Sequence, residues 1–479
     1  MTPRAYAACD GVELSRRIRA GEFAPRETLD AAYALIDRLN GRLNAFVALE
    51  REVAYAAADR CGTGPLAGVP VAMKDCVGFV RGTTRSFGSR LADGMRIEHD
   101  DELVTRYRAA GLVPMGTTNV PELSSSLSTE SKLHGPCRNP WNPLHAVGGS
   151  SGGAAAAVAA GIVPIAYGND SAGSIRIPSS CCGVFGFRPS RGRVPTGPVY
   201  GEIWYGLLSH HVITRSVRDS ALVLDLTAGV DHGAPYAAPT SERSYFEACN
   251  TAPQRLRIAI DDGARRRVAL HADCAAALED TCNLLRALGH EVIRAAPDYD
   301  GQQLSGHVAT LLTVALAEEL PAIAAETRRA IGPETVESCQ RALAERGAGV
   351  TALELSRVLR YRTDLGRLLG RFFAEYDVLL TPTLAEPPLP LGVLNADSDD
   401  LDGYLDRMWR YSPFAALANL CGTPSMSVPL CWSRAGLPIG MMFTGPYASE
   451  ADLFSLAAEL ERTRSWLHRH PPLSAWAID

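Results

Sequence analysis

The densest cluster of glycine and hydroxyl side chains lies between residues 148 and 195, and it begins with Gly-Gly-Ser-Ser-Gly-Gly at 148–153. Glycine lets the backbone turn sharply and approach a ligand closely, so this segment is a candidate site. Its serines, Ser150 and Ser151, could supply a nucleophile or a hydrogen-bonding hydroxyl. The spacing alone fits a phosphate-binding loop, a nucleophile turn and a purely structural turn.

Two of these interpretations need further residues. A phosphate-binding loop needs lysine and then Ser or Thr at the start of a helix, whereas residues 154–157 are all alanine. The pattern Gly148-x-Ser150-x-Gly152 fits a nucleophile elbow, which requires a downstream histidine. The candidate histidines, none of them in a recognisable context, are His210, His211, His290 and His468.

Lysine is scarce in this chain. Of 47 basic residues only Lys74 and Lys132 are lysine. Lysine, unlike arginine, can lose its proton in a protein, so a position that keeps lysine can serve as a base. Lys74 ends the apolar run at 66–74, which predicts a buried strand, and burial would lower its pKa. Lys132 has no such context and is predicted to be a surface charge.

The glycine-rich segments continue in a specific order. Residues 168–178 read Gly-Asn-Asp-Ser-Ala-Gly-Ser-Ile-Arg-Ile-Pro, and residues 186–195 read Gly-Phe-Arg-Pro-Ser-Arg-Gly-Arg-Val-Pro. Together with 148–153, they resemble the signature of the amidase signature family. The resemblance extends through residues 68–75, 135–141, 420–425 and 436–440 and covers nearly the whole chain. Its most variable part is roughly 230–375.

The resemblance implies a Ser–cis-Ser–Lys triad composed of Lys74, Ser150 and Ser174. Ser174 would be the nucleophile that forms an acyl-enzyme with a carboxylic amide. Ser150, preceded by a cis peptide bond, would relay the proton, and neutral Lys74 would be the general base and acid. A serine hydroxyl is barely acidic and needs such a base within hydrogen-bond reach, so these roles are chemically consistent.

The same resemblance assigns further residues. Backbone N–H groups of Ser171, Ala172, Gly173 and Ser174 would form the oxyanion hole. Ala172 departs from the family's commoner Asp-x-Gly-Gly-Ser pattern, and an alanine would be strained if this position needed positive φ. Residues predicted to hold the loops are Ser151, Asp170 and Arg176. The run Ser124-Ser125-Ser126 is predicted to line the substrate channel, with Ser125 and Ser126 as the substrate-binding residues; the alternative is a structural loop.

The elements that must position these residues follow from periodicity. Helices are expected at 12–18, 29–39, 101–110, 154–160 and 274–288, and residues 305–376 are helical in pattern. Strands are expected at 66–74, 112–116, 256–260 and 291–293. The strand–helix–strand order of the last region indicates a βαβ unit. The Pro-rich stretch 382–390 is predicted to be an ordered loop.

The fold class expected is α/β, with a mixed, twisted central sheet covered by helices on both faces. The chain has no repeats, low-complexity tracts or obvious linkers, which favours one domain over residues 1–479. Within it we distinguish an N-terminal helical segment (1–65), the signature core (66–230), a variable, partly helical region (231–375) and the C-terminal part of the core (376–479).

Composition and charge disfavour several classes of binding partner. The net charge of −6 and the absence of a dense basic stretch disfavour nucleic acid and anionic membranes. No uninterrupted apolar run approaches a membrane span and no signal peptide is visible, so a cytoplasmic location is expected. The 12 cysteines are scattered, which predicts reduced thiols and neither a disulfide framework nor a zinc site.

We therefore expect a metal-independent amidase that needs no cofactor and acts on a small-molecule amide. Whether the enzyme forms a homodimer is left open. Three alternatives remain. One is the glutaminase subunit of a tRNA-dependent amidotransferase, and another is an esterase-type Ser150–His hydrolase. The third is a binding protein that has kept the fold, against which the presence of Lys74, Ser150 and Ser174 argues.

Overall fold

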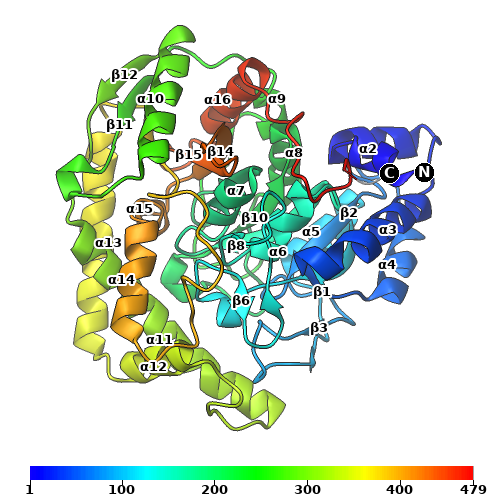
Figure 1. Cartoon of the computed structure of the whole chain (residues 1–479), viewed down its shortest axis with the longest axis horizontal. Helices are drawn as coiled ribbons and strands as arrows, with labels where there is room; N and C mark the ends of the chain where they lie inside the picture. Colours follow the sequence, from blue (N-terminus) through cyan, green and yellow to red (C-terminus); the bar gives the residue numbers. More distant parts are fainter. Residues whose placement is uncertain (478–479) are drawn as a thin grey trace.

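The computed structural model describes residues 1–477 and shows a single domain built around an 11-stranded mixed sheet (Figure 1). The strand order is β1-β5-β2-β8-β10-β9-β14-β15-β13-β11-β12. The strands of this sheet are β1 (Phe46–Ala48), β2 (Pro70–Lys74), β5 (Val113–Thr118), β8 (Ile165–Asp170), β9 (Phe185–Arg188), β10 (Ser209–Thr214), β11 (Arg257–Ile260), β12 (Glu291–Arg294), β13 (Val378–Pro382), β14 (Ser425–Trp432) and β15 (Pro438–Thr444). Two short hairpins lie outside it, β3 (Thr84–Arg85) with β4 (Met95–Arg96) and β6 (Glu130–Ser131) with β7 (Gly135–Pro136).

Sixteen α-helices and three short 3₁₀ turns complete the described residues. The helices are α1 (Pro3–Ala7), α2 (Gly11–Arg19), α3 (Pro25–Leu43), α4 (Arg51–Ala58), α5 (Glu102–Ala110), α6 (Gly152–Ala159), α7 (Arg176–Cys182), α8 (Val217–Thr227), α9 (Tyr245–Ala248), α10 (Ala272–Ala287), α11 (Gly301–Thr327), α12 (Ser338–Ala348), α13 (Ala352–Phe372), α14 (Leu401–Tyr411), α15 (Ala416–Cys421) and α16 (Glu450–Thr463). The 3₁₀ turns are η1 (Glu122–Ser124), η2 (Trp204–Gly206) and η3 (Ala264–Arg266). In Figure 1, α2–α4 lie on the side of the molecule opposite to α11–α14.

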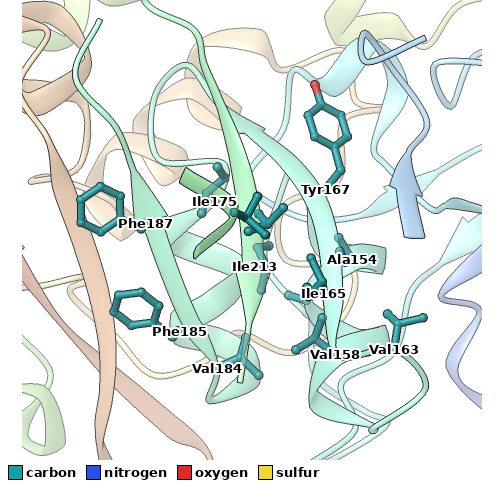
Figure 2. Close-up of a cluster of buried hydrophobic side chains, with 14 of the residues drawn as sticks. Ala154, Val158, Val163, Ile165, Tyr167, Ile175, Val184, Phe185, Phe187 and Ile213 are labelled. Carbon is teal, nitrogen blue, oxygen red and sulfur yellow. The ribbon is translucent and has the colours of Figure 1, made fainter. Parts of the chain in front are cut away.

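Strand β9 shows that helices cover both faces of the sheet. Side chains alternate between the two faces of a strand. Phe187 stacks on Phe454 of α16, with ring centroids 4.2 Å apart, and Figure 2 shows Phe185 on the same side of β9. Gly186 faces the other way, where a Cβ would lie 2.2 Å from the Ser179 hydroxyl of α7. Helices α7 and α16 therefore sandwich the strand, as the predicted fold class requires.

Helix α6 is buried along its whole length. It consists only of glycine, alanine and one valine, so it has no polar face to present to solvent. Ala154 and Val158 of this helix lie in one apolar cluster with side chains of β8, β9 and β10 (Figure 2). The helix contacts β2 and β5 as well as β8 and β10, so it holds together the centre of the sheet.

The apolar run at 66–74 is only partly a strand. Residues 66–69 form a turn in which the N–H groups of Leu66 and Gly68 donate to the carbonyls of Ala110 and Gly111. The strand β2 begins at Pro70 and is completely buried, between β5 and β8, to both of which it is parallel. Lys74 is thus delivered at the carboxyl end of a central strand.

The variable region follows its predicted pattern. Strands β11 and β12 are parallel and are joined through α10, which makes the expected βαβ unit. Residues 301–372 contain α11, α12 and α13. Pro382 still belongs to β13, and the predicted loop is found at 383–390 apart from one isolated bridge at Pro390. Within residues 1–477, one helix, α11, is long and apolar enough by length and composition to cross a membrane, which the search for uninterrupted apolar runs did not predict.

Two helical glycines offer a matched test of packing at the start of α6. A Cβ on Gly153 would lie 2.4 Å from the backbone N of Asn119 and 2.5 Å from the carbonyl O of Ala45. Gly153→Ala should therefore destabilise the protein by about 1–3 kcal/mol, because backbone must move. Gly370 in α13 is exposed with open space around it, so Gly370→Ala should stabilise by about 0.5–1 kcal/mol. Chemical denaturation measures both; equal effects would contradict this packing.

Candidate active site

Lys74 lies in contact with Ser150. Its Nζ is 2.7 Å from the hydroxyl of Ser150 and 2.7 Å from the side-chain oxygen of Asn169. The Lys74 side chain is fully buried, and no carboxylate is hydrogen-bonded to its amine within residues 1–477. The structure thus brings together two of the three predicted triad residues at hydrogen-bond distance.

Burial sets the protonation of this amine. Desolvation disfavours the ammonium form and lowers the pKa of Lys74 to about 8, although the negative charge of Asp170 opposes the shift. An amine with this pKa is substantially neutral in mildly alkaline solution. It can therefore accept a proton under conditions in which an exposed lysine cannot.

The turn that carries Ser150 is packed too closely to admit other residues. The peptide bond between Gly149 and Ser150 is cis. A Cβ on Gly149 would lie 2.7 Å from the carbonyl O of Ser126, and the hydroxyl of Thr129 donates to the carbonyl of Gly148 at 2.8 Å. Gly149 is thus required by the neighbouring segment at 126–129, whereas Gly148 has a φ of 74° and is confined by Cys181 and Pro178 of α7.

Ser174 lies against the same turn. Its carbonyl accepts from the backbone N–H of Ser151 at 3.2 Å, and the Ser151 hydroxyl donates to the carbonyl of Asn169 at 3.3 Å. Ser174 is buried, with 7% of its surface exposed, and its hydroxyl makes no hydrogen bond within the described chain. Ser151 thus links the two glycine-rich loops, and the Ser174 hydroxyl is left without a competing partner.

The N–H groups of the loop at 171–174 differ in whether they already donate a hydrogen bond within the protein. The N–H of Gly173 donates to the carboxylate of Asp170 at 2.7 Å. Those of Ser171, Ala172 and Ser174 have no hydrogen-bond acceptor among residues 1–477. Three of the four predicted oxyanion-hole donors are therefore open, whereas the fourth is already bound to the protein.

The structure also shows whether Ala172 strains the backbone of this loop. The residue with positive φ in this loop is Gly173, at 120°, and Ala172 is not in the left-handed region. A Cβ on Gly173 would lie 2.6 Å from Ile177 and 2.9 Å from Ala415. Alanine at position 172 therefore imposes no backbone strain, because the neighbouring glycine makes the turn.

Asp170 and Arg176 form a fully buried ion pair beneath this loop. Two Arg176 nitrogens donate to the two Asp170 oxygens, each at 2.9 Å. Burial alone would raise the pKa of Asp170, but the adjacent guanidinium holds it well below its usual range. Arg176 also donates to the carbonyl of Ala415 at 2.9 Å and to Asn419 at 2.6 Å. Asp170 binds the loop at Gly173, Arg176 binds Asp170, and neither residue lines the cavity; their role as supports of the loop stays a prediction.

Three further residues were missed by sequence reasoning. Asn169 binds the amine of Lys74, and Asn419 of α15 donates to Asp170 at 2.8 Å. Asp75 accepts from the N–H groups of Ser86 and Gly88 at 2.9 and 3.2 Å and so fixes the chain just after β2. Asn169 and Asp75 fall inside the signature segments, which was an available signal. Asn419 lies about 250 positions from its partner, and no local pattern could have paired them.

The candidate histidines are not hydrogen-bonded to Ser150 in the part of the chain that the structure describes. Tyr167 and the Nδ1 of His210 are 2.7 Å apart, and His211 contacts the Ser220 hydroxyl at 2.8 Å. Both imidazoles are buried, and burial lowers each pKa to about 3. Among the described residues, no histidine is hydrogen-bonded to Ser150 and no group of three His, Cys, Asp or Glu side chains could hold a metal ion.

A cavity of about 330 Å³ opens above Ser150 and Ser171. Its walls are mainly apolar, with a few carboxylates. The lining residues are Cys76, Val77, Phe79, Phe87, Met95, Arg96, Ile97, Glu98, His99, Leu123, Ser124, Ser150, Asn169, Ser171, Val199, Tyr200, Ile203, Trp204, Leu208, Glu319, Ala322, Ile323 and Glu326.

The predicted channel residues Ser125 and Ser126 are absent from this wall, and Ser124 takes their place. The Ser125 hydroxyl donates to the carbonyl of Glu122 at 3.0 Å and accepts from Gln340 at 3.0 Å. The serine run turns at η1, so only its first member reaches the cavity. A role of Ser125 and Ser126 in substrate binding stays a prediction.

Strained backbone is concentrated around the cavity. Four of its lining residues, none of them glycine, have φ between 49° and 55°: Phe87, Leu123, Ser124 and Trp204. Such conformations cost about 1–3 kcal/mol each and persist where the surrounding packing determines them. The shape of the cavity is therefore held by the fold as a whole.

Comparison with known proteins agrees with this geometry. The model of the family described as Amidase matches residues 27–454. The chain is similar to 6-aminohexanoate-cyclic-dimer hydrolase of Paenarthrobacter ureafaciens, with 34% identity over 97% of this chain and 96% of that protein. Its fold is similar to that of 6-aminohexanoate cyclic dimer hydrolase complexed with substrate, with a TM-score of 0.91, 32% identity and coverage of 98% and 99%. A bacterial aryl acylamidase of the amidase signature family gives a TM-score of 0.86, 26% identity and 96% coverage of both chains.

The chain therefore belongs to the amidase signature family, as its motifs predicted, and it is an enzyme that hydrolyses the C–N bond of amides. The match extends over the first and last strands of the sheet as well as the signature core. The predicted fold class, a single domain with a large mixed sheet between helices, is confirmed.

The buried ion pair under the loop gives a second matched test. Arg176→Gln leaves the Asp170 carboxylate buried without its counter-charge, which should cost about 3–5 kcal/mol of stability and disorganise the loop at 171–174. Arg410 pairs with Asp406 at 2.9 Å on the surface, with side chains 77% and 54% exposed, so Arg410→Gln should change stability little. Thermal and chemical unfolding of both variants are the measurements. An Arg176 variant as stable as the Arg410 variant would contradict the role given to the pair.

Proposed function

We propose that this enzyme cleaves a carboxylic amide through an acyl-enzyme on Ser174, with Ser150 as proton relay and Lys74 as general base and acid. The observation that carries the proposal is the 2.7 Å contact between the buried Lys74 amine and the Ser150 hydroxyl. An amine whose pKa is lowered by burial to about 8 can take a proton from this hydroxyl in mildly alkaline solution.

Acylation begins as the Ser174 oxygen attacks the amide carbon. The Ser174 proton passes to Ser150, and the proton of Ser150 passes to neutral Lys74. The carbonyl π electrons move to oxygen and give a tetrahedral oxyanion. When this intermediate collapses, the C–N bond breaks and the leaving nitrogen takes a proton back from Lys74 through Ser150. The products of this half-reaction are a neutral amine and an ester on Ser174, with Lys74 neutral again.

The oxyanion would be stabilised by backbone donors. The N–H groups of Ser171, Ala172 and Ser174 are open in the structure, and each donor in such a hole is worth roughly 3 kcal/mol in the transition state. The Gly173 N–H contributes indirectly, because its bond to Asp170 fixes the turn. Preorganisation by Asp170 and Arg176 means that no reorientation is needed as the charge develops.

Deacylation repeats the same steps with water. A water molecule gives a proton to Ser150 and on to Lys74, and its oxygen attacks the ester carbon. Collapse of the second tetrahedral intermediate breaks the bond to the Ser174 oxygen, which recovers a proton from Lys74 through Ser150. The acid is released and the enzyme returns to its initial protonation state.

The cavity supports a substrate with a largely apolar body. Its lining is dominated by aliphatic and aromatic side chains, and the relative of known substrate acts on the 6-aminohexanoate cyclic dimer. We propose a medium-sized amide with a flexible hydrocarbon portion, for which that cyclic dimer is a suitable first compound. A glutaminase role is disfavoured, because the one guanidinium on the wall, Arg96, is 78% exposed and offers no enclosed site for an amino acid carboxylate.

Replacement of the nucleophile tests the assignment of Ser174. Ser174→Ala should lose at least about 1000-fold in kcat and should no longer be labelled by a fluorophosphonate probe, because no acyl or phosphonyl group can attach. Peptide mass mapping of the labelled wild-type enzyme should place the adduct on Ser174. An adduct on Ser150 would instead favour the esterase-type alternative. Near wild-type turnover by the Ser174→Ala variant would refute the assignment of Ser174 as the nucleophile.

The pH profile tests Lys74. The base must be unprotonated, so activity is lost as the pH falls below the pKa of Lys74, near 8. We expect kcat/KM to rise about tenfold per pH unit up to about pH 8 and then to level off, so the value at pH 6 should be about 100-fold below the plateau. Lys74→Arg keeps the charge but cannot release its proton and should be inactive across this range. A flat profile, or an active Arg variant, would exclude proton acceptance by residue 74.

A further inference from the structure

Glu319 of α11 presents an unused carboxylate oxygen to the active-site cavity. The residue is half-buried on the cavity wall. Its Oε1 accepts a hydrogen bond from the indole N–H of Trp204 at 2.6 Å. Its Oε2 makes no hydrogen bond within residues 1–477. One oxygen thus fixes the side chain in place, and the other remains available to a ligand.

The charge around Glu319 is predominantly negative. Glu98 and Glu326 also line the cavity, whereas the one arginine on its wall, Arg96, projects to solvent and lies 3.7 Å from Glu98. No lysine lines the cavity. Burial raises the pKa of Tyr200, another residue of the wall, to about 12, and the negative charge of Glu319 adds to this shift. A cation would therefore be attracted to this end of the cavity.

The carboxylate is ionised under the conditions in which the catalytic amine is neutral. Burial raises the pKa of Glu319 to about 7, the Trp204 bond opposes the shift, and neighbouring Glu318 adds to it. Above pH 8, where Lys74 can act as a base, Glu319 carries its negative charge. Burial of an ionised carboxylate with one unpartnered oxygen costs free energy when no opposite charge lies nearby. A bound cation would supply that opposite charge.

We propose that Glu319 is a specificity-determining residue that selects amides bearing an ammonium group at the end of an apolar chain. The ammonium would donate to Oε2 of Glu319 while the chain lies against apolar walls that include Phe79, Phe87 and Leu123. The scissile carbonyl would then lie at Ser150 and Ser171, which line the same cavity. The inference rests on the proposed function of this site and adds the chemical class of its substrate.

The experiment compares charged and neutral acyl chains of equal size. The substrates are 4-nitroanilides of ω-amino acids, from 4-aminobutanoyl to 8-aminooctanoyl, and those of the alkanoic acids in which a methyl group replaces the ammonium. The wild-type enzyme should favour the ammonium compound at the best chain length at least tenfold in kcat/KM, mainly through KM. Glu319→Gln should remove this preference, so that kcat/KM for the ammonium anilide falls to that of its methyl counterpart, while glutamine can still accept from Trp204.

Glu318→Gln is the matched control, because Glu318 is exposed and does not line the cavity. It should keep the wild-type preference. Equal or better use of the methyl compounds by the wild-type enzyme, or an unchanged preference in Glu319→Gln, would overturn the proposal.

A binding measurement separates this proposal from the catalytic one. Fluorophosphonate labelling of Ser174 is followed in the presence of 6-aminohexanamide or of heptanamide, its isosteric neutral counterpart. The charged amide should protect the wild-type enzyme at concentrations at least tenfold lower, and this difference should vanish in Glu319→Gln. Labelling without selective protection, or protection by neither amide, would refute the role of Glu319. Anilide hydrolysis without labelling of Ser174 would instead refute the proposed nucleophile, and the kinetic preference would still decide the role of Glu319.

Discussion

The structure depends on one constraint: an amine must be kept out of water and within hydrogen-bond reach of a hydroxyl. Lys74 satisfies it because it ends a central strand, β2, that is buried between β5 and β8. Helix α6 excludes water from the same region because nearly all of its side chains are methyl groups or smaller. The desolvation that lowers the amine pKa opposes stability, and the surrounding apolar core must offset it.

Charge is handled differently in the layer beneath the catalytic loop. Asp170 and Arg176 are as deeply buried as Lys74, but each has a counter-charge and several hydrogen bonds. Their bonds draw α15 and the loop at 171–174 into one rigid unit. In the part of the chain that the structure describes, the charges beneath the loop therefore compensate each other, whereas the Lys74 amine is hydrogen-bonded only to neutral groups.

The shape of the cavity beside Ser150 and Ser171 also depends on tertiary packing. Its walls come from segments distant in sequence, including η1, η2 and α11, and several of their residues hold left-handed backbone conformations. Most of the lining residues lie between positions 76 and 208, and α11 adds Glu319, Ala322, Ile323 and Glu326 from the variable region. This arrangement allows the chemistry to stay constant while the wall, including Glu319, sets which amide enters.

The sequence by itself determined the family, the α/β class, the strand that ends at Lys74 and the glycine turn before Ser150. The family follows from the resemblance of the glycine-rich motifs. The local elements follow from short-range patterns, because a buried strand, a tight turn and an alanine helix each have such a signature. Only the tertiary structure decided the contact between Lys74 and Asn169, the pairing of Asp170 with Asn419, the engagement of the Gly173 N–H and the choice of Ser124 over Ser125 and Ser126. These are contacts between segments or outcomes of a single turn, and one sequence carries no local pattern for either.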